Sequence, residues 1–161
     1  MTHMKIEFSM DGYMSILAHA QDSGFEIGPV VENHRDTAYL ALRHDIDFSP
    51  QMALRMAEME AAMGIQSTYY VMLNSPFYNS LETYNVNVLL EIAASGHTLG
   101  LHWDSRFGAT NTGASRLELL QRQIQSLSDA LGIPIENISQ HEPTASPFID
   151  STRLPVLEAY S

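Results

Sequence analysis

Residues 37–47 read Thr-Ala-Tyr-Leu-Ala-Leu-Arg-His-Asp-Ile-Asp, an apolar run that passes at once into charged side chains. The apolar part, Thr37–Leu42, is typical of a strand that is buried on both faces of a covered parallel sheet. Further on, Ser49 has the features of a helix N-cap and Pro50 those of a first helical residue, and we expect this helix to run to Met63. A buried strand followed closely by a helix is the unit from which α/β folds are built.

The same alternation of helices and strands continues along the chain. The expected elements are a helix Asp11–Ser23, the strand Thr37–Leu42, the helix Pro50–Met63, a strand Ser67–Leu73, a helix Glu82–Ser95, a strand Thr98–Trp103, a helix Ser115–Leu131 and a strand Asn137–His141. This order predicts an α/β protein with parallel strands and right-handed crossovers. Because the sequence has no internal repeat or linker, we expect residues 1–161 to form a single domain.

Composition and charge exclude several classes of function. The 161 residues contain 8 Lys and Arg against 19 Asp and Glu, a formal charge of −11, which argues against nucleic acid or anionic lipid as the main partner. The absence of cysteine excludes disulfides, thiolate zinc sites, iron–sulfur clusters and cysteine nucleophiles. No apolar run approaches the ~20 residues of a membrane span, and Met1–Met10 lacks the apolar core of a secretory signal, so we expect a cytoplasmic protein.

Three polar clusters lie at the ends of expected strands. They are Arg43–Asp47, His102–Asp104 and Ser139–Pro143. In parallel α/β folds the carboxyl ends of the strands meet at one face, and ligands bind there. Two carboxylates and two imidazoles that meet at this face are a typical ligand set for a divalent metal ion.

The spacing of the two aspartates in the first cluster adds detail. Asp45 and Asp47 lie two residues apart, so on an extended backbone both leave the same face, and His44 leaves the other. Two anions so close repel each other unless a cation lies between them or one takes up a proton. A metal ion with one carboxylate as ligand and the other as general base satisfies both conditions. Helix capping or ion pairing with Arg43 or Arg55 is an alternative of equal weight.

Other conspicuous side chains have simpler interpretations. Four methionines at helical spacing predict a core-facing stripe rather than a soft-metal or peptide groove: Met52, Met56, Met59 and Met63. His97 follows a helix end and begins a strand, so we expect its imidazole to bind helix carbonyls rather than a metal. Trp103 is expected in the core or in a pocket wall. The histidines without a partner pattern are expected at the surface: His3, His19 and His34.

Several motifs together resemble the NodB-homology polysaccharide deacetylases, carbohydrate esterase family 4 (CE4). They are Asp-Ile-Asp at 45–47, Ser-Thr-Tyr-Tyr-Val at 67–71 and Gly-His-Thr-Leu-Gly-Leu-His at 96–102. Arg-His-Asp-Ile-Asp-Phe-Ser at 43–49 and Ser-Gln-His-Glu-Pro-Thr at 139–144 resemble, more narrowly, the WbmS-like branch. The resemblance covers roughly Leu40 to Pro147. It implies a distorted (β/α) barrel that hydrolyses acetyl groups on sugars, with zinc or another divalent ion held by one Asp and two His.

Carried over by position, the resemblance assigns roles to individual residues. Asp45 matches the catalytic base, Asp47 the metal-binding aspartate and His102 the first metal-binding histidine. The second histidine of the family is replaced by Arg106, which keeps its proton and cannot bind a cation. Either His141 supplies the third ligand from the next strand end, or the site is reduced, with His141 only lining the pocket.

Four neighbours of these positions are assigned to substrate binding: Arg43, His44, Trp103 and Arg106. The family continues with further strands and a Leu-His motif, whereas this sequence stops at Ser161, so we expect a barrel that lacks its C-terminal strands. A homo-oligomer that covers an open sheet edge is compatible with this expectation.

The leading functional hypothesis is a metal-dependent hydrolase, with zinc as the first choice of divalent ion, that removes acetyl or similar acyl groups from a carbohydrate substrate. The second is a non-catalytic relative that binds a metal or a sugar and has lost turnover. A TIM-like enzyme of different chemistry is a third, which rests on fold analogy alone. Metal analysis beside a deacetylation assay separates the first two hypotheses.

Overall fold

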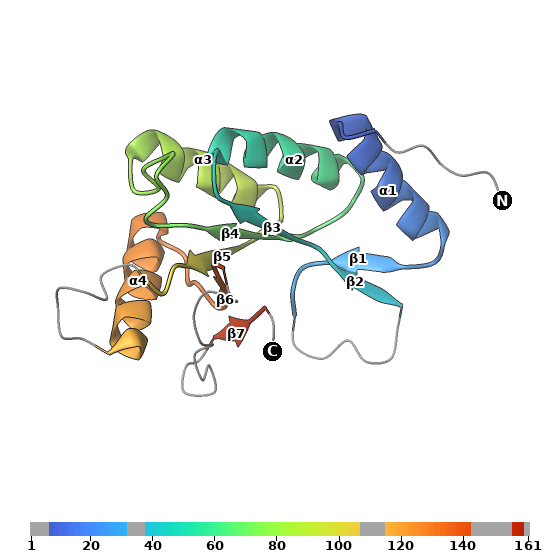
Figure 1. Ribbon diagram of the computed structural model, residues 1–161. Helices are drawn as coiled ribbons and strands as arrows, with labels where there is room; N and C mark the ends of the chain where they lie inside the picture. Colours follow the sequence, from blue (N-terminus) through green and yellow to red (C-terminus); the bar gives the residue numbers. More distant parts are fainter. Residues whose placement is uncertain (1–6, 32–37, 107–114, 143–155, 160–161) are drawn as a thin grey trace.

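The computed structural model describes residues 7–31, 38–106, 115–142 and 156–159 (Figure 1). In chain order its elements are α1 (Met10–Asp22), β1 (Glu26–Gly28), β2 (Tyr39–Ala41), β3 (Arg43–Ile46), α2 (Pro50–Ala62), β4 (Thr68–Val71), α3 (Thr83–Ala94), β5 (Thr98–Trp103), α4 (Arg116–Leu131), β6 (Asn137–Gln140) and β7 (Leu157–Glu158). No helix in these ranges is long and apolar enough to cross a bilayer.

The main sheet has five parallel strands in the order β3-β4-β5-β6-β7, so each strand pairs with the next one along the chain. Helices α2, α3 and α4 connect the first four strands and lie along one face of the sheet (Figure 1). A strand order that never reverses, with its helices on one face, is the winding of a (β/α) barrel rather than of a doubly wound sheet. The expected fold class is therefore confirmed. Strands β1 and β2 form a separate parallel pair.

Local capping signals explain why the helices begin and end where the sequence predicts. Ser49 Oγ accepts a hydrogen bond from the Met52 N–H (3.3 Å), with Pro50 in the first turn. Ser115 and Glu118 form a reciprocal capping box at the start of α4. At the other end of α4, Gly132 takes a left-handed conformation (φ 67°) that ends the helix.

The strand expected at Thr37–Leu42 is misplaced. Its described part, β2, pairs only with β1, and the first strand of the main sheet is β3, which contains the charged residues that were expected to follow the strand. This is possible because β3 is an edge strand among the described residues and its polar side chains find partners on both faces. Strands β1 and β7 were not expected, since two or three residues show no periodicity.

The prediction of a core-facing methionine stripe on α2 is also wrong. Met52 is 48% exposed, and the other three methionines are only partly buried. The side of α2 that faces the core carries Ala53, Ala57 and Glu60 instead. Small alanines allow the helix to lie close to its neighbours, and the buried carboxylate of Glu60 is compensated by hydrogen-bond donors described below.

The alternating directions of the side chains along β5 define the two faces of the sheet. Leu99, Leu101 and Trp103 belong to the buried cluster that joins the sheet to the helices. Because successive side chains leave opposite faces, His102 points away from the helices. We call this side, which carries Asp45, Tyr70, His102 and Ser139 on four neighbouring strands, the inner face.

Candidate metal centre

Asp47, His102 and His141 come together at the carboxyl ends of three strands. Asp47 directly follows β3, His102 is the penultimate residue of β5 and His141 directly follows β6. One ligand atom from each lies within 4.8 Å of the other two, a grouping that meets the geometric requirement for a metal site. His141, which the sequence offered as a replacement for the histidine missing at Arg106, is thus beside His102.

The distances in this cluster fit a small divalent cation. His102 Nε2 lies 3.1 Å from His141 Nδ1 and 3.5 Å from Asp47 Oδ1, and His141 Nδ1 lies 3.9 Å from Asp47 Oδ1. Tetrahedral zinc with bonds of ~2.0–2.1 Å has ligand atoms about 3.3 Å apart. In addition, Asp47 Oδ1 is buried and has no hydrogen-bond partner among the described residues. A buried, unbonded carboxylate oxygen facing two imidazoles is a site that a cation would stabilise.

The surroundings of His102 prepare it as a ligand. Its Nδ1–H donates to the carbonyl of Ser139 (3.2 Å), so Nε2 carries the free electron pair toward the cluster. The side chain is almost completely buried. Burial lowers the pKa of His102, and although Asp45 and Asp47 oppose this effect the net shift is downward. The neutral imidazole, the form that binds metals, is therefore favoured.

His141 is held by backbone and side-chain contacts. Its N–H donates to the carbonyl of Trp103 (2.8 Å), which continues the β5–β6 ladder one residue beyond β6. Its Nδ1 faces His102, and its Nε2 lies 3.7 Å from Glu142 Oε1. A carboxylate behind the second ring nitrogen is a common means of orienting a metal-binding histidine.

Asp45 lies next to the cluster but outside the three ligating residues. Arg43 Nη2 donates to both of its carboxylate oxygens (2.8 and 3.0 Å) and to Ser139 Oγ (2.6 Å). One oxygen of Asp45 is 3.9 Å from His102 Nδ1. The side chain is 29% exposed, so water reaches it. Arg43 therefore fixes the orientation of a carboxylate that borders both the cluster and solvent.

Arg106, at the position of the missing histidine, is bound by two carboxylates. It pairs with Asp104 (3.0 Å) and Glu142 (3.0 Å), and its side chain is 59% exposed. Burial raises the pKa of Asp104, but its hydrogen bonds to Arg106 outweigh burial and lower it. The positive charge that would oppose a nearby cation is thus compensated by its neighbours.

His44 and Trp103, two of the four residues assigned to substrate binding, face the helices. His44 Nε2 lies 2.6 Å from Glu60 Oε1, and Trp103 is 2% exposed within the core. Both side chains therefore point away from the inner face, although His44 also lines the cavity that borders Asp45 and Asp47. Their assignment to substrate binding stays a prediction. Arg43 and Arg106 border the candidate site. His97 behaves as expected, because its Nε2 donates to the Ala57 carbonyl (2.9 Å). His19 is exposed as expected, while His3 and His34 lie outside the described residues.

Sequence reasoning missed the group that surrounds Glu60. This carboxylate is fully buried and accepts hydrogen bonds from Tyr13, His44, Ser67 and Tyr69. An acidic residue in an amphipathic helix is normally exposed, so no local signal identifies it. The cluster lies on the helix-facing side of β3, across the strand from Asp45.

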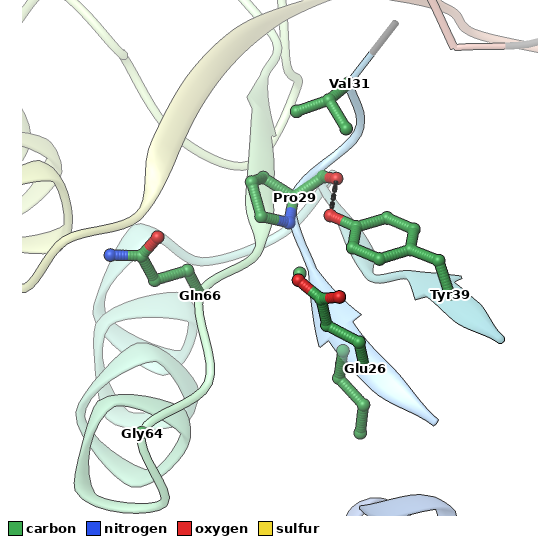
Figure 2. Close-up of a pocket in the computed structure, with 8 residues that line it drawn as sticks. Glu26, Pro29, Val31, Tyr39, Gly64 and Gln66 are labelled. Atoms are coloured by element: carbon green, nitrogen blue, oxygen red, sulfur yellow. Dashed lines mark hydrogen bonds between the residues drawn. The ribbon is translucent and has the colours of Figure 1, made fainter. Parts of the chain in front are cut away.

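Two cavities border the strands described above. One of about 380 Å³ runs along β3 and α2. Its lining includes Asp45, Asp47 and Phe48, and also residues on the helix-facing side such as His44, Ala53 and Tyr69. Another, of about 350 Å³, is shown in Figure 2, where the Tyr39 hydroxyl donates to the Pro29 carbonyl (2.6 Å).

The second cavity lies away from the candidate metal centre. Its lining includes Gly64 and Gln66, which precede β4, and therefore lies at the amino end of that strand. The metal-ligand candidates lie at the carboxyl ends, so this cavity is not part of their site.

Three solved structures resemble this chain. A mutant of BA3943, described as a CE4 family pseudoenzyme with restored enzymatic activity, gives a TM-score of 0.56 at 14% identity, over 81% of this chain and 47% of that chain. The chitin deacetylase of the fungal pathogen Colletotrichum lindemuthianum gives 0.51 at 18% identity, over 70% of this chain and 49% of that chain. IcaB from Ammonifex degensii gives 0.57 at 18% identity, over 82% and 66%.

These similarities establish the fold. The chain spans about half to two thirds of the length of these proteins. No protein-family model matches the sequence, and no curated protein does. The resemblance to NodB-homology deacetylases is therefore confirmed as a resemblance of fold, and the WbmS-like branch stays a prediction.

Proposed function

We propose that this chain is a metal-dependent hydrolase that removes acetyl or similar acyl groups from a carbohydrate. The observation that carries the proposal is the grouping of Asp47, His102 and His141, with Asp45 beside it, at the carboxyl ends of strands in a CE4-like fold. This is the face at which enzymes of barrel folds place their chemistry.

Zinc is the proposed ion, because one carboxylate and two imidazoles suit it and leave a coordination position open for substrate or water. When bound, such an ion supplies the positive charge that polarises an acyl carbonyl and favours deprotonation of water. Asp47, His102 and His141 would hold it. Within the NodB-homology deacetylases, we propose the WbmS-like branch for this chain, because residues 43–49 and 139–144 resemble the motifs of that branch.

Asp45 is the proposed general base. Its carboxylate accepts a proton from the attacking water while the water oxygen forms a bond to the acyl carbon and the carbonyl π pair moves onto the carbonyl oxygen. That pair then returns, the bond from the acyl carbon to the sugar nitrogen or oxygen breaks, and the released atom takes up the proton from Asp45. Arg43 holds this carboxylate in one orientation through both of its oxygens and is itself held by Ser139. Proton transfer from a positioned base requires such a fixed geometry.

The alternative is a non-catalytic relative that binds metal or sugar. Arg106 at the position of the second histidine favours this alternative, and one of the similar structures is described as a pseudoenzyme whose activity a mutation restored. The two functions share the metal cluster and differ only in turnover.

One preparation tests both functions. The protein is purified, its bound metal is measured by elemental analysis, and the same sample is assayed for acetate release from N-acetylated chito-oligosaccharides with and without added Zn²⁺. Deacetylation that a chelator abolishes and Zn²⁺ restores supports the enzyme. Stoichiometric metal without acetate release supports the non-catalytic relative. Asp22→Asn, on exposed helix surface at the end of α1, is the control variant, in which metal content and acetate release should both be unchanged.

A further inference from the structure

Two large aromatic side chains are exposed together near the candidate metal centre. Phe48 is 65% exposed and Phe77 is 62% exposed. Their ring centroids are 4.5 Å apart and the ring planes are tilted by 39°. Exposed apolar groups that touch each other, next to a functional cleft, are a common sign of a ligand-binding surface.

The pair is attached to the metal-ligand candidate Asp47 itself. Phe48 is the next residue in the chain. The loop that carries Phe77 is tied to the same backbone, because Ser75 Oγ donates to the Asp47 carbonyl (2.7 Å) and accepts from the Phe77 N–H (3.1 Å). The backbone segments that carry the two rings are therefore joined beside the candidate ligand Asp47.

A second set of hydrogen bonds, made by the Tyr78 hydroxyl, strengthens this arrangement. The Tyr78 hydroxyl donates to the Ile46 carbonyl (2.7 Å) and accepts from the Met72 N–H (3.1 Å). The segment from Met72 to Tyr78 is thus bound at two points to the end of β3. A surface that is fixed before a ligand arrives loses little conformational entropy on binding.

One cavity borders both Phe48 and the two carboxylates. Phe48 and Met52 line the same cavity of about 380 Å³ as Asp45 and Asp47. A ligand placed over Phe48 can therefore reach the segment Arg43–Asp47, which carries the proposed base and one of the three proposed metal ligands.

We propose that Phe48 and Phe77 form a stacking platform for a sugar ring of the substrate, adjacent to the unit that is deacylated. This inference rests on the proposed function. The C–H face of a pyranose is apolar and carries a weak positive charge, so it packs on the negative face of an aromatic ring, while its hydroxyl groups stay in water. The formal charge of −11 disfavours an acidic polysaccharide, so the occupant is a neutral N-acetylated or a cationic amino-sugar unit.

The test compares Phe77→Ala with two variants of the full chain. Phe77→Tyr keeps a ring, and Phe25→Ala removes an exposed aromatic side chain (43% exposed) that precedes β1. Phe77 is chosen because it is not adjacent in sequence to a metal-ligand candidate. Equal metal content and equal thermal unfolding of all four proteins show that fold and metal site are intact.

Binding of an N-acetylated chito-oligosaccharide is measured by calorimetry, and KM and kcat are measured for the same sugar. We expect Phe77→Ala to raise Kd and KM about tenfold with kcat changed less than threefold. Phe77→Tyr, which keeps a ring, should recover most of the lost binding, and Phe25→Ala should match the wild type. Unchanged Kd in Phe77→Ala, an equal loss in Phe25→Ala, or a wild type that binds no such sugar overturns the platform. Sugar binding without hydrolysis overturns only the catalytic proposal.

One further outcome points to another occupant. If Phe77→Ala leaves sugar binding unchanged but converts a dimer into a monomer in sedimentation, the aromatic pair is an interface between two copies of the chain, and the platform is rejected.

Discussion

Asp45 and Asp47 are two residues apart, yet their surroundings differ in a way that separates a base from a ligand. The carboxylates of Asp45 and Asp47 are both partly exposed, but Asp45 is paired with Arg43, whereas one oxygen of Asp47 is buried between two imidazoles with no hydrogen bond from the described residues. We expect Asp45→Asn to lower kcat by ~10²–10⁴-fold while bound metal is retained, because a base contributes proton transfer and not coordination. Acetate release and elemental analysis of the same sample check this. If Asp45→Asn loses the metal and Asp47→Asn keeps it, Asp45 is the ligand and Asp47 is the base.

His141 and His102 differ in burial but face the same point. His102 is buried on the inner face, whereas the His141 side chain is 22% exposed. If both are ligands, His141→Ala and His102→Ala should weaken zinc binding to a similar extent, measured by competition with a chromogenic chelator. His19→Ala, on exposed helix surface, is the control. Unchanged zinc affinity in His141→Ala together with loss in His102→Ala shows that His141 is not a ligand and favours the non-catalytic function.

Among the helices, the packing of α2 depends on the buried carboxylate of Glu60 more than on the methionines of this helix. Glu60 accepts bonds from α1, β3, β4 and the residue before β4, through Tyr13, His44, Tyr69 and Ser67. Removing one partner from a buried, charged network leaves other polar groups unpaired. We expect Glu60→Gln to lower the free energy of unfolding by about 3 kcal/mol in urea titrations. Glu58→Gln, on the exposed side of the same helix, should change it by less than ~0.5 kcal/mol.

The same carboxylate gives the acid dependence of stability a defined direction. Burial raises the pKa of Glu60, but the hydrogen bond and charge of His44 and the bonds from Ser67 and Tyr13 outweigh it and lower the pKa to about 2, from an ordinary value of 4.5. Because the folded-state pKa is depressed, the stabilisation is complete above pH 4.5 and is lost as pH falls toward 2. Unfolding free energies between pH 6 and 2.5 should fall less steeply in Glu60→Gln than in the wild type. Parallel curves would show that Glu60 does not contribute.

For the whole molecule, the candidate metal centre joins three strand ends that are far apart in sequence. Asp47 directly follows β3, His102 is the penultimate residue of β5, and His141 directly follows β6. A cation bound by all three would therefore connect β3, an edge strand among the described residues, to the middle of the sheet. A ligand that binds only the folded state stabilises it by ~2.7 kcal/mol at one hundred times its Kd. Zn²⁺ should therefore raise Tm in calorimetry, and Asp47→Asn should remove the rise. An equal rise in both proteins would place the ion elsewhere.

The positions of the helices and of three strands are determined locally. Ser49 with Pro50, Ser115 with Glu118, and Gly132 each act on backbone groups within a few residues, and the observed helix ends agree with the predicted ones to within a residue. Three strands, β4, β5 and β6, were also recognisable, because apolar and β-branched runs are a property of the segment itself. The polar residues at the ends of these strands could be predicted to converge, since parallel strands share a carboxyl edge.

Only the tertiary structure decides which residues contact each other across the fold. His141 lies 39 positions from His102, and Arg43 lies 96 positions from Ser139, so the strand pairing of the sheet decides that they touch. The same holds for Glu60 on α2, whose burial depends on donors from α1, β3, β4 and the residue before β4. Capping and periodicity are short-range and are encoded by neighbouring residues, whereas the cost of burying a charge depends on which distant groups surround it, and only the folded chain decides that.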